Sequence, residues 1–238
     1  TEMTLQEYLC CVVRAEMPAT FEAEALKAQA ILIRTNLSDG GKTELLVEDE
    51  AYGREKVPEI CYLAAAETKG ICLIYEGAPV YGAYFKVSSG MTRNAGELLE
   101  EGEYPYLSSV SCDRDFLSEE YTDIMKYDLS EFERKWEDLQ QTTDDIDTEN
   151  AEKASFAEDL DIAFLCDSAG YVTYIGRGGK WVSGENFRYA FALPSSSFQI
   201  QSRGKEVIFT TKGIGHGLGM SQFGANEMAK EGKSYSEI

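Results

Sequence analysis

The chain has 238 residues and carries 42 acidic against 22 basic side chains, a formal net charge of −20 at pH 7. This length can form one large domain or two small ones with a substantial core. The charge argues against nucleic acid and against a strongly anionic surface as a tight partner, whereas a mostly neutral polysaccharide stays compatible. No run approaches the roughly 18 apolar residues that a membrane span needs.

The first predicted helix begins at Thr4, where Glu7 three residues later completes a capping box. An amphipathic stripe follows and consists of Leu5, Tyr8, Leu9, Val12 and Val13. The next position on this stripe is Glu16, and Pro18 ends the helix almost at once. A carboxyl group is therefore expected on the inward face of the last helical turn.

Two effects at this position disfavour the ionised form of Glu16. Removal from water and the negative end of the helix dipole both raise the pKa of a carboxyl group. A carboxyl that stays protonated near neutral pH can act as a general acid. The alternative is a carboxylate that turns aside at a frayed helix end and simply meets water.

A second helix is predicted directly afterwards, with Thr20 as its N-cap. Its apolar stripe consists of Leu26, Ala30, Ile33 and Leu37. Gln29 lies on that stripe and Arg34 on its flank, so both are candidates to reach the same cleft as Glu16. The alternative for Arg34 is a surface cation with a packed stem.

Further along the chain, the pattern predicts helices and hairpins without alternating βα units, which indicates an α+β fold. The expected elements are a turn at 39–41, a short helix at 59–69, a hairpin with strands at 71–75 and 80–87 joined through Glu76 and Gly77, strands at 162–165 and 171–175, a turn at 176–179, a short helix from 184, a hairpin with strands at 198–200 and 207–211, and a helix from Gln222 to about Lys230 capped by Ser221.

Acidic residues are concentrated between positions 97 and 161, which hold 22 of the 42 acidic and only five basic residues. The simplest interpretation is a solvated insertion. Residues 128–161 are helix-prone, with Phe132, Trp136 and Leu139 as a thin apolar stripe.

The six cysteines include no CxxC pair, and the chain has one histidine, so no zinc-ligand spacing is visible and no metal or cofactor is predicted. Cys10 and Cys11 are adjacent on the first helix, which suits burial as small apolar groups. Outside the cytoplasm one or two disulfides stay open, but nothing in the sequence identifies them.

Five segments resemble blocks of the stage II sporulation protein D family, which includes an amidase-enhancer branch. They are RAEMPATFEAEALKAQAILIRT at 14–35, YFKVSSGMTRNA at 84–95, YPYLSSV at 104–110, SGENFRYAFALPSSSF at 183–198 and GIGHGLGMSQFGANEMAKEG at 213–232. The resemblance spans nearly the whole chain in the family's order. It implies a membrane-tethered, peptidoglycan-degrading protein of the engulfment step of endospore formation, with Glu16 as the catalytic acid.

The resemblance also makes the polar loop after residue 87 a candidate for saccharide binding through Ser89, Thr92 and Arg93. At the other end of the chain, His216 lies among glycines 213, 215, 217 and 219, which allow the backbone to approach a ligand or another segment closely. We expect His216, with Ser221 and Gln222 after it, to bind sugar or hold Glu16. The alternative is a histidine that locks two loops together.

Ordinary glycosidases use two carboxylates, whereas the motif segments supply Glu16 and no second inward acid. A single-acid scheme is therefore expected, in which Glu16 protonates the leaving oxygen and then takes the proton of the substrate's own 6-hydroxyl. This reaction, lytic transglycosylation, is what the resemblance implies. The alternatives are a hydrolase with an unseen second carboxylate and a non-catalytic glycan-binding module that activates an amidase.

The sequence thus predicts one α+β catalytic domain over residues 1–238, with the acidic insertion at about 97–161. N-terminal helices precede β-hairpins and a C-terminal loop and helix, and an active-site cleft lies between these arms. The expected partners are peptidoglycan glycan strands, a cell-wall amidase and a membrane scaffold protein of the engulfment machinery. The expected location is extracytoplasmic, with a membrane anchor in an N-terminal segment outside this sequence.

Overall fold

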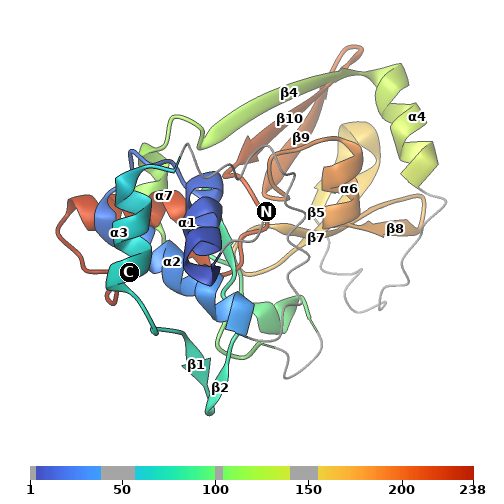
Figure 1. Ribbon diagram of the computed structural model, residues 1–238. Coiled ribbons are helices and arrows are strands. Elements are labelled where there is room, and N and C mark those ends of the chain that lie inside the picture. Colours follow the sequence, from blue (N-terminus) through green and yellow to red (C-terminus); the bar gives the residue numbers. More distant parts are fainter. Residues whose placement is uncertain (1–3, 39–56, 100–103, 140–154) are drawn as a thin grey trace. The chain divides into compact units, whose positions relative to one another are not determined.

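The computed structural model describes residues 4–38, 57–99, 104–139 and 155–238, which divide into two compact units (Figure 1). Unit 1 comprises residues 1–84 and 219–238, and unit 2 comprises residues 85–218. Helices dominate the first unit and antiparallel strands the second, so the predicted α+β class is confirmed. The single catalytic domain stays a prediction, and the turn predicted at 39–41 lies outside the described residues.

Four helices and three short strands form the described part of unit 1. They are α1 (Leu5–Glu16), α2 (Ala23–Ser38), α3 (Glu59–Glu67), α7 (Gln222–Lys230), β1 (Ile74–Tyr75), β2 (Ala78–Pro79) and β11 (Met220–Ser221). A further strand, β3 (Tyr84–Phe85), lies at the unit boundary and pairs with β11. Buried side chains of all four helices share one core, in which Leu9, Leu26, Ala64 and Ala225 take part.

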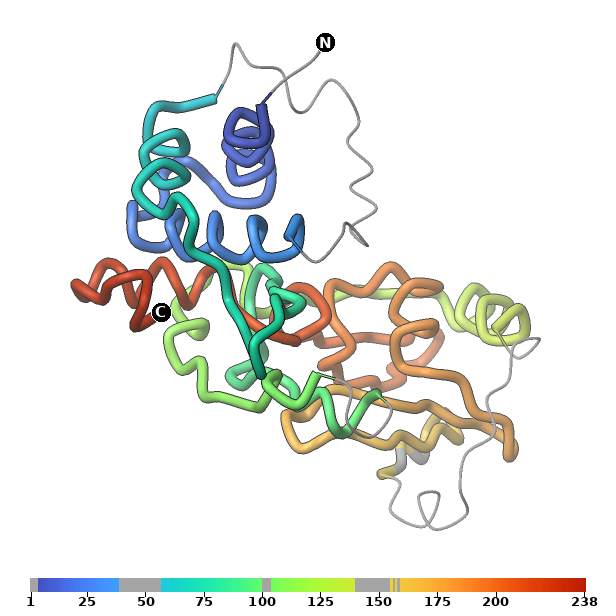
Figure 2. Tube along the Cα trace, turned by 60° about the horizontal axis from the view of Figure 1, so that its bottom comes forward, coloured from blue at the N-terminus to red at the C-terminus, as the bar shows by residue number. Residues whose placement is uncertain are grey.

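Local signals fixed the start of α1 but not that of α2. Thr4 and Glu7 form the predicted capping box, and the N–H of Met17 closes the last turn of α1. Thr20, in contrast, lies in a turn and does not cap α2, which begins only at Ala23. The N–H of Glu22 is instead bound by the Asn226 side chain of α7 at 2.8 Å. A tertiary contact thus takes the place of the predicted local cap, and Figure 2 shows α7 in red beside α2 in blue.

A hairpin follows α3 as predicted, but its second strand is β2 at Ala78–Pro79 and not the predicted strand at 80–87. Glu76 and Gly77 both have positive φ, at 49° and 85°, as a tight two-residue hairpin turn requires. The predicted strand at 80–87 is reduced to β3, because Gly82 exchanges hydrogen bonds with the side chain of Asn36 on α2 instead of with a neighbouring strand.

Unit 2 holds two antiparallel sheets. Its main elements are β4 (Thr122–Asp128), α4 (Leu129–Leu139), β5 (Ser155–Ala157), β6 (Ile162–Cys166), β7 (Val172–Arg177), β8 (Lys180–Ser183), α6 (Gly184–Ala190), β9 (Phe198–Arg203) and β10 (Glu206–Lys212), with 3-10 turns at Ala95–Glu97, Asp113–Leu117 and Glu158–Leu160. One sheet has the order β4-β10-β9 and the other β5-β6-β7-β8. The short helix from 184 and the hairpins predicted in this region are confirmed. Of the helix-prone stretch at 128–161, residues 129–139 form α4, residues 140–154 lie outside the described residues, and residues 155–157 form the strand β5 instead of helix. The strands β4 and β8 were not predicted.

The acidic segment contributes to the core of unit 2, which corrects its interpretation as a merely solvated insertion. Phe132 and Trp136 of α4 are almost fully buried, as their apolar stripe predicted. They pack against aromatic rings from α6 and β10, including Phe187 and Phe209. Along β4 the register with β10 runs over seven residue pairs, so the segment also supplies an edge strand.

None of the described helices combines the length and the apolar composition that a membrane crossing requires.

Candidate functional site

Glu16 is the last residue of α1, as predicted. The buried residues Leu9, Val12 and Val13 anchor the helix in the core. The chain leaves the helix at Met17, which is extended with φ −135° and ψ 134° before Pro18. Glu16 itself is half-buried. The residue therefore lies between full burial and free exposure.

Of the two glutamines predicted for the site, Gln222 binds the main chain of Glu16 and also the side chain of Gln29. The side-chain nitrogen of Gln222 donates to the Glu16 carbonyl at 3.0 Å and to the amide oxygen of Gln29 at 3.3 Å. Gln29 is fully buried, and its own amide nitrogen has no hydrogen-bond partner among the residues that the structure describes. Ser221 caps α7 through its hydroxyl, which accepts from the Gly224 N–H, so it fixes where Gln222 stands.

Arg34 is engaged at another place in unit 1. Its guanidinium donates to the carbonyls of Ala65 and Ile71, at 2.9 and 3.2 Å, and to the hydroxyl of Thr68. Burial lowers the pKa of Arg34, although its charge lies against carbonyls at the negative end of α3. These contacts brace the end of α3. Arg34 is buried and so is not the surface cation that the sequence offered as an alternative, whereas its role in the cleft with Glu16 stays a prediction.

In unit 2, the loop after Val87 is held from several sides. The N–H of Ser88 is bound by the buried carboxylate of Asp115 at 2.7 Å, and the carbonyl of Ser89 accepts from the Tyr121 hydroxyl at 2.8 Å. Thr92 is buried, and its hydroxyl accepts from the N–H of Val110. Of the three loop residues predicted to bind saccharide, only Ser89 is more than slightly exposed.

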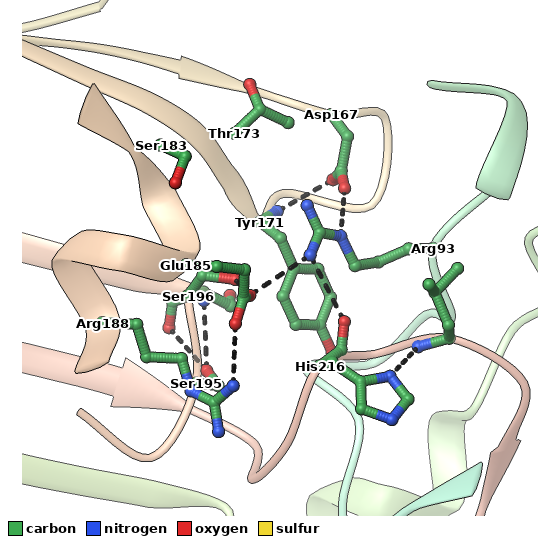
Figure 3. A network of polar contacts seen from close by, with 12 residues as sticks. Arg93, Asp167, Tyr171, Thr173, Ser183, Glu185, Arg188, Ser195, Ser196 and His216 are labelled. Carbon is green, nitrogen blue, oxygen red and sulfur yellow. Dashed lines mark hydrogen bonds and ion pairs between the residues drawn. The ribbon is translucent and has the colours of Figure 1, made fainter. Parts of the chain in front are cut away.

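Arg93 is the centre of a buried polar network (Figure 3). Its side chain is 4% exposed, and its Nε donates to Asp167, whose side chain is 1% exposed, at 2.5 Å. Its Nη1 lies 3.5 Å from Glu185 and donates to the main-chain carbonyl of His216 at 3.3 Å. The guanidinium also lies over the ring of Tyr171, 5.0 Å from the centroid.

The carboxylates of this network are themselves oriented. Asp167 accepts from two backbone N–H groups, including that of Tyr171 at 2.9 Å. Glu185 binds Arg188 at 2.8 Å and accepts from the Ser196 hydroxyl at 2.8 Å. Sequence reasoning missed all of these partners. The one available signal was that Glu185 and Ser196 stand in the motif block at 183–198.

The glycines around His216 permit close approach to other segments of the chain. A Cβ at Gly213 would stand 2.6 Å from the carbonyl of Val87, and one at Gly217 would stand 2.7 Å from the ring of Tyr171. The N–H of Gly215 also donates to the main-chain carbonyl of Pro194. The sequence left open whether these glycines admit a ligand or another segment of the chain. The neighbouring chain segments account for them.

His216 is half-buried, and its ring lies 5.7 Å from that of Phe85. The N–H of Leu218 donates to His216 Nδ1 at 3.1 Å. In the neutral imidazole this bond places the proton on Nε2, which makes Nε2 a donor. The loop thus presents a histidine of defined tautomer and leaves its contact with sugar or with Glu16 a prediction.

The predicted residues therefore form two groups, with Glu16, Gln29 and Gln222 in unit 1 and the Ser89 loop, Arg93 and His216 in unit 2. In the described residues, no group of three or more His, Cys, Asp or Glu side chains could hold a metal ion, and all six cysteines are free thiols.

Comparison with known proteins identifies the family. Residues 1–75 match the family SpoIID, described as Stage II sporulation protein. The chain is 33% identical to Stage II sporulation protein D of Bacillus subtilis and 31% identical to that of Bacillus amyloliquefaciens, in both cases over 98% of this chain and 71% of the relative. It is 27% identical to the Amidase enhancer of Bacillus subtilis, over 95% of this chain and 38% of that protein.

The structure defines an α+β protein with a glutamate at the end of its first helix. The chain belongs to the stage II sporulation protein D family, a family of sporulation proteins, which confirms the resemblance drawn from its motifs.

Proposed function

We propose that this protein is a peptidoglycan lytic transglycosylase that acts during endospore engulfment, with Glu16 as its general acid and then its base. The observation that carries the proposal is the position of Glu16. It is half-buried and ends α1, inside the family's N-terminal motif. Gln222 binds its main-chain carbonyl, so the helix end that carries the carboxyl is held in place before substrate arrives.

The reaction needs one carboxyl group. Protonated Glu16 gives its proton to the oxygen of the bond between N-acetylmuramic acid and N-acetylglucosamine, and that bond breaks. The Glu16 carboxylate then accepts the proton of the 6-hydroxyl of the muramic acid residue, whose oxygen attacks the anomeric carbon and closes a 1,6-anhydro ring. The attacking oxygen belongs to the substrate, so no water is consumed and the attack has the advantage of an intramolecular reaction.

Nearby acids in unit 1 support a single-carboxyl scheme. Glu24 is tied to Lys27 at 2.6 Å and to the backbone of Tyr235 at 2.7 Å, and these partners lower the pKa of Glu24. Glu22 is exposed at the start of α2. The carboxylate of Glu24 is thus occupied by Lys27 and Tyr235, and Glu22 is open to solvent, so neither is favoured as the second carboxylate of a hydrolase.

Digestion of peptide-free glycan strands in heavy-oxygen water tests the reaction. We expect new ends that are lighter by one water than hydrolysed ends and that carry no label. Labelled reducing ends as the main product would identify a two-carboxylate hydrolase and overturn the single-acid mechanism.

The matched control is Glu16→Gln, which keeps the size and polarity of the side chain but cannot transfer the proton. It should be inactive. Because an ionised carboxyl at a helix C-terminus opposes the helix dipole, it should melt no lower than the parent at pH 7. A lower melting temperature would mean that Glu16 is a structural ion.

The similarity to an amidase enhancer favours a second candidate, a non-catalytic glycan-binding module that stimulates a cell-wall amidase. In that case the parent and the Glu16→Gln variant would stimulate an added amidase equally, and neither would cleave glycan alone. For the transglycosylase we propose an extracytoplasmic location with a membrane anchor, and an amidase and a membrane scaffold protein of the engulfment machinery as partners. The amidase would supply the peptide-free strands.

A further inference from the structure

Phe116 in unit 2 is an exposed aromatic ring whose position is fixed by the protein beneath it. The residue is 56% exposed. Its ring atoms Cζ and Cε1 lie 3.1 and 3.3 Å from the point where a Cβ on Gly90 would stand, so the ring edge occupies the space of the missing side chain. The ring of Tyr121 meets it edge to face, with centroids 4.9 Å apart.

This support is connected to the Ser89 loop, which the sequence predicts to bind saccharide. The Tyr121 hydroxyl that donates to the Ser89 carbonyl belongs to the ring that supports Phe116. Gly90, under the ring, follows Ser89 directly and has φ +116°. The aromatic ring and the saccharide-binding loop are thus one rigid piece, and little conformational entropy is lost when a ligand stacks on the ring.

The exposed side chains that neighbour Phe116 in the sequence indicate the chemistry of a ligand. Asp113, Glu119 and Glu120 are exposed carboxylates within four residues of it. Carboxylates accept hydrogen bonds but donate none, so they suit a ligand rich in hydroxyl donors. An apolar protein surface would have to remove them from water without compensation, and a densely anionic ligand would be repelled. A pyranose ring has an apolar C–H face and a rim of hydroxyls, and it matches both features.

We infer that Phe116 is a stacking platform for a pyranose ring of the glycan, next to the turn at Ser89 and Gly90. This inference rests on the proposed function, because it names a sugar subsite beside the same loop. It adds a residue that lies outside the motif blocks, and it assigns the hydroxyl-binding role to carboxylates that the reaction does not use.

The test measures binding of a neutral probe, a hexamer of β-1,4-linked N-acetylglucosamine, by isothermal titration calorimetry. Phe116→Ala should weaken binding by about tenfold, as expected when an aromatic anchor is truncated, and Phe116→Trp should retain it. The control is Tyr189→Ala, which removes another aromatic residue of unit 2 that is 73% exposed. Its affinity should equal that of the parent, and all variants should melt within a few degrees of the parent because both side chains are exposed.

The failure of the platform differs from the failure of the proposed function. Equal affinity of Phe116→Ala and the parent would overturn the platform, even if the parent cleaves glycan strands. An affinity loss in Tyr189→Ala as large as in Phe116→Ala would overturn it too, as would a parent that does not bind the hexamer. Binding that depends on Phe116 in a parent that cleaves no glycan would support the platform and reject the transglycosylase.

Discussion

Replacement of Arg93 by methionine tests whether the buried network of unit 2 is structural. Methionine keeps an unbranched apolar stem without the guanidinium, and it leaves the Asp167 carboxylate, 1% exposed, with only backbone N–H partners. Breaking a buried ion pair by removing one partner costs about 3–5 kcal/mol. At roughly 2–4 °C per kcal/mol for a chain of this size, the melting temperature should fall by about 6–20 °C.

The assay is thermal unfolding followed by circular dichroism, with glycan binding measured below the transition. Arg93→Lys is the matched control for charge: one ammonium cannot bind Asp167, Glu185 and the His216 carbonyl in the geometry of the guanidinium fork, so this variant should also lose stability. The double variant Arg93→Met/Asp167→Asn lacks the carboxylate charge that Arg93→Met leaves unpaired. Part of the stability lost in Arg93→Met should therefore be recovered. Unchanged melting with lost glycan binding would refute the structural reasoning and favour the saccharide contact that the sequence predicted.

Two further predictions concern His216 and the buried thiols. If His216 donates from Nε2 to the substrate, His216→Ala should lower activity by more than roughly tenfold while stability falls by about 1 kcal/mol, the value of one hydrogen bond such as that from Leu218. Losses of activity and stability in equal proportion would make His216 only a brace between loops. Burial and the neighbouring thiols Cys11 and Cys61 raise the pKa of Cys10 from 9.0 to about 11. The folded state therefore keeps a proton that the unfolded chain releases, so stability is full below pH 9 and falls by roughly 3 kcal/mol as pH rises to 11. Denaturant titrations of the parent and Cys10→Ala should show a smaller loss in the variant, and parallel curves would contradict the assignment.

The elements predicted correctly are those whose signals lie within a few residues of one another. The capping box at Thr4 and Glu7 and the stop at Pro18 bound α1, and Ser221 bounds α7. The strand β4 gave no such signal, because most of its residues are exposed and acidic or polar. Its pairing with β10 stabilises it, and that partner lies some eighty residues away in the sequence. Propensity decides little where a strand depends on its neighbour.

The site shows the same division between local and distant information. The helix period placed Gln29 inward, and the structure buries it fully. Arg93 looked like a loop arginine, and nothing near it in sequence indicated that Asp167 and Glu185, 74 and 92 residues away, would enclose its charge. Polar residues that bind one another across a fold cannot be distinguished from ligand-binding residues by spacing alone.

A motif can support a functional argument only where packing within the chain does not already account for its residues. The glycine-rich motif around His216 is accounted for by packing, since side chains at Gly213 or Gly217 would collide with the chain itself. A match to that motif therefore identifies the loop and says little about chemistry. Position 16 is different, because it continues the buried stripe of Leu9, Val12 and Val13, where packing alone would favour an apolar residue. Glu16 is half-buried at the C-terminal end of a helix, where the dipole opposes an ionised carboxyl, and the proposed reaction is therefore built on Glu16 and not on the histidine.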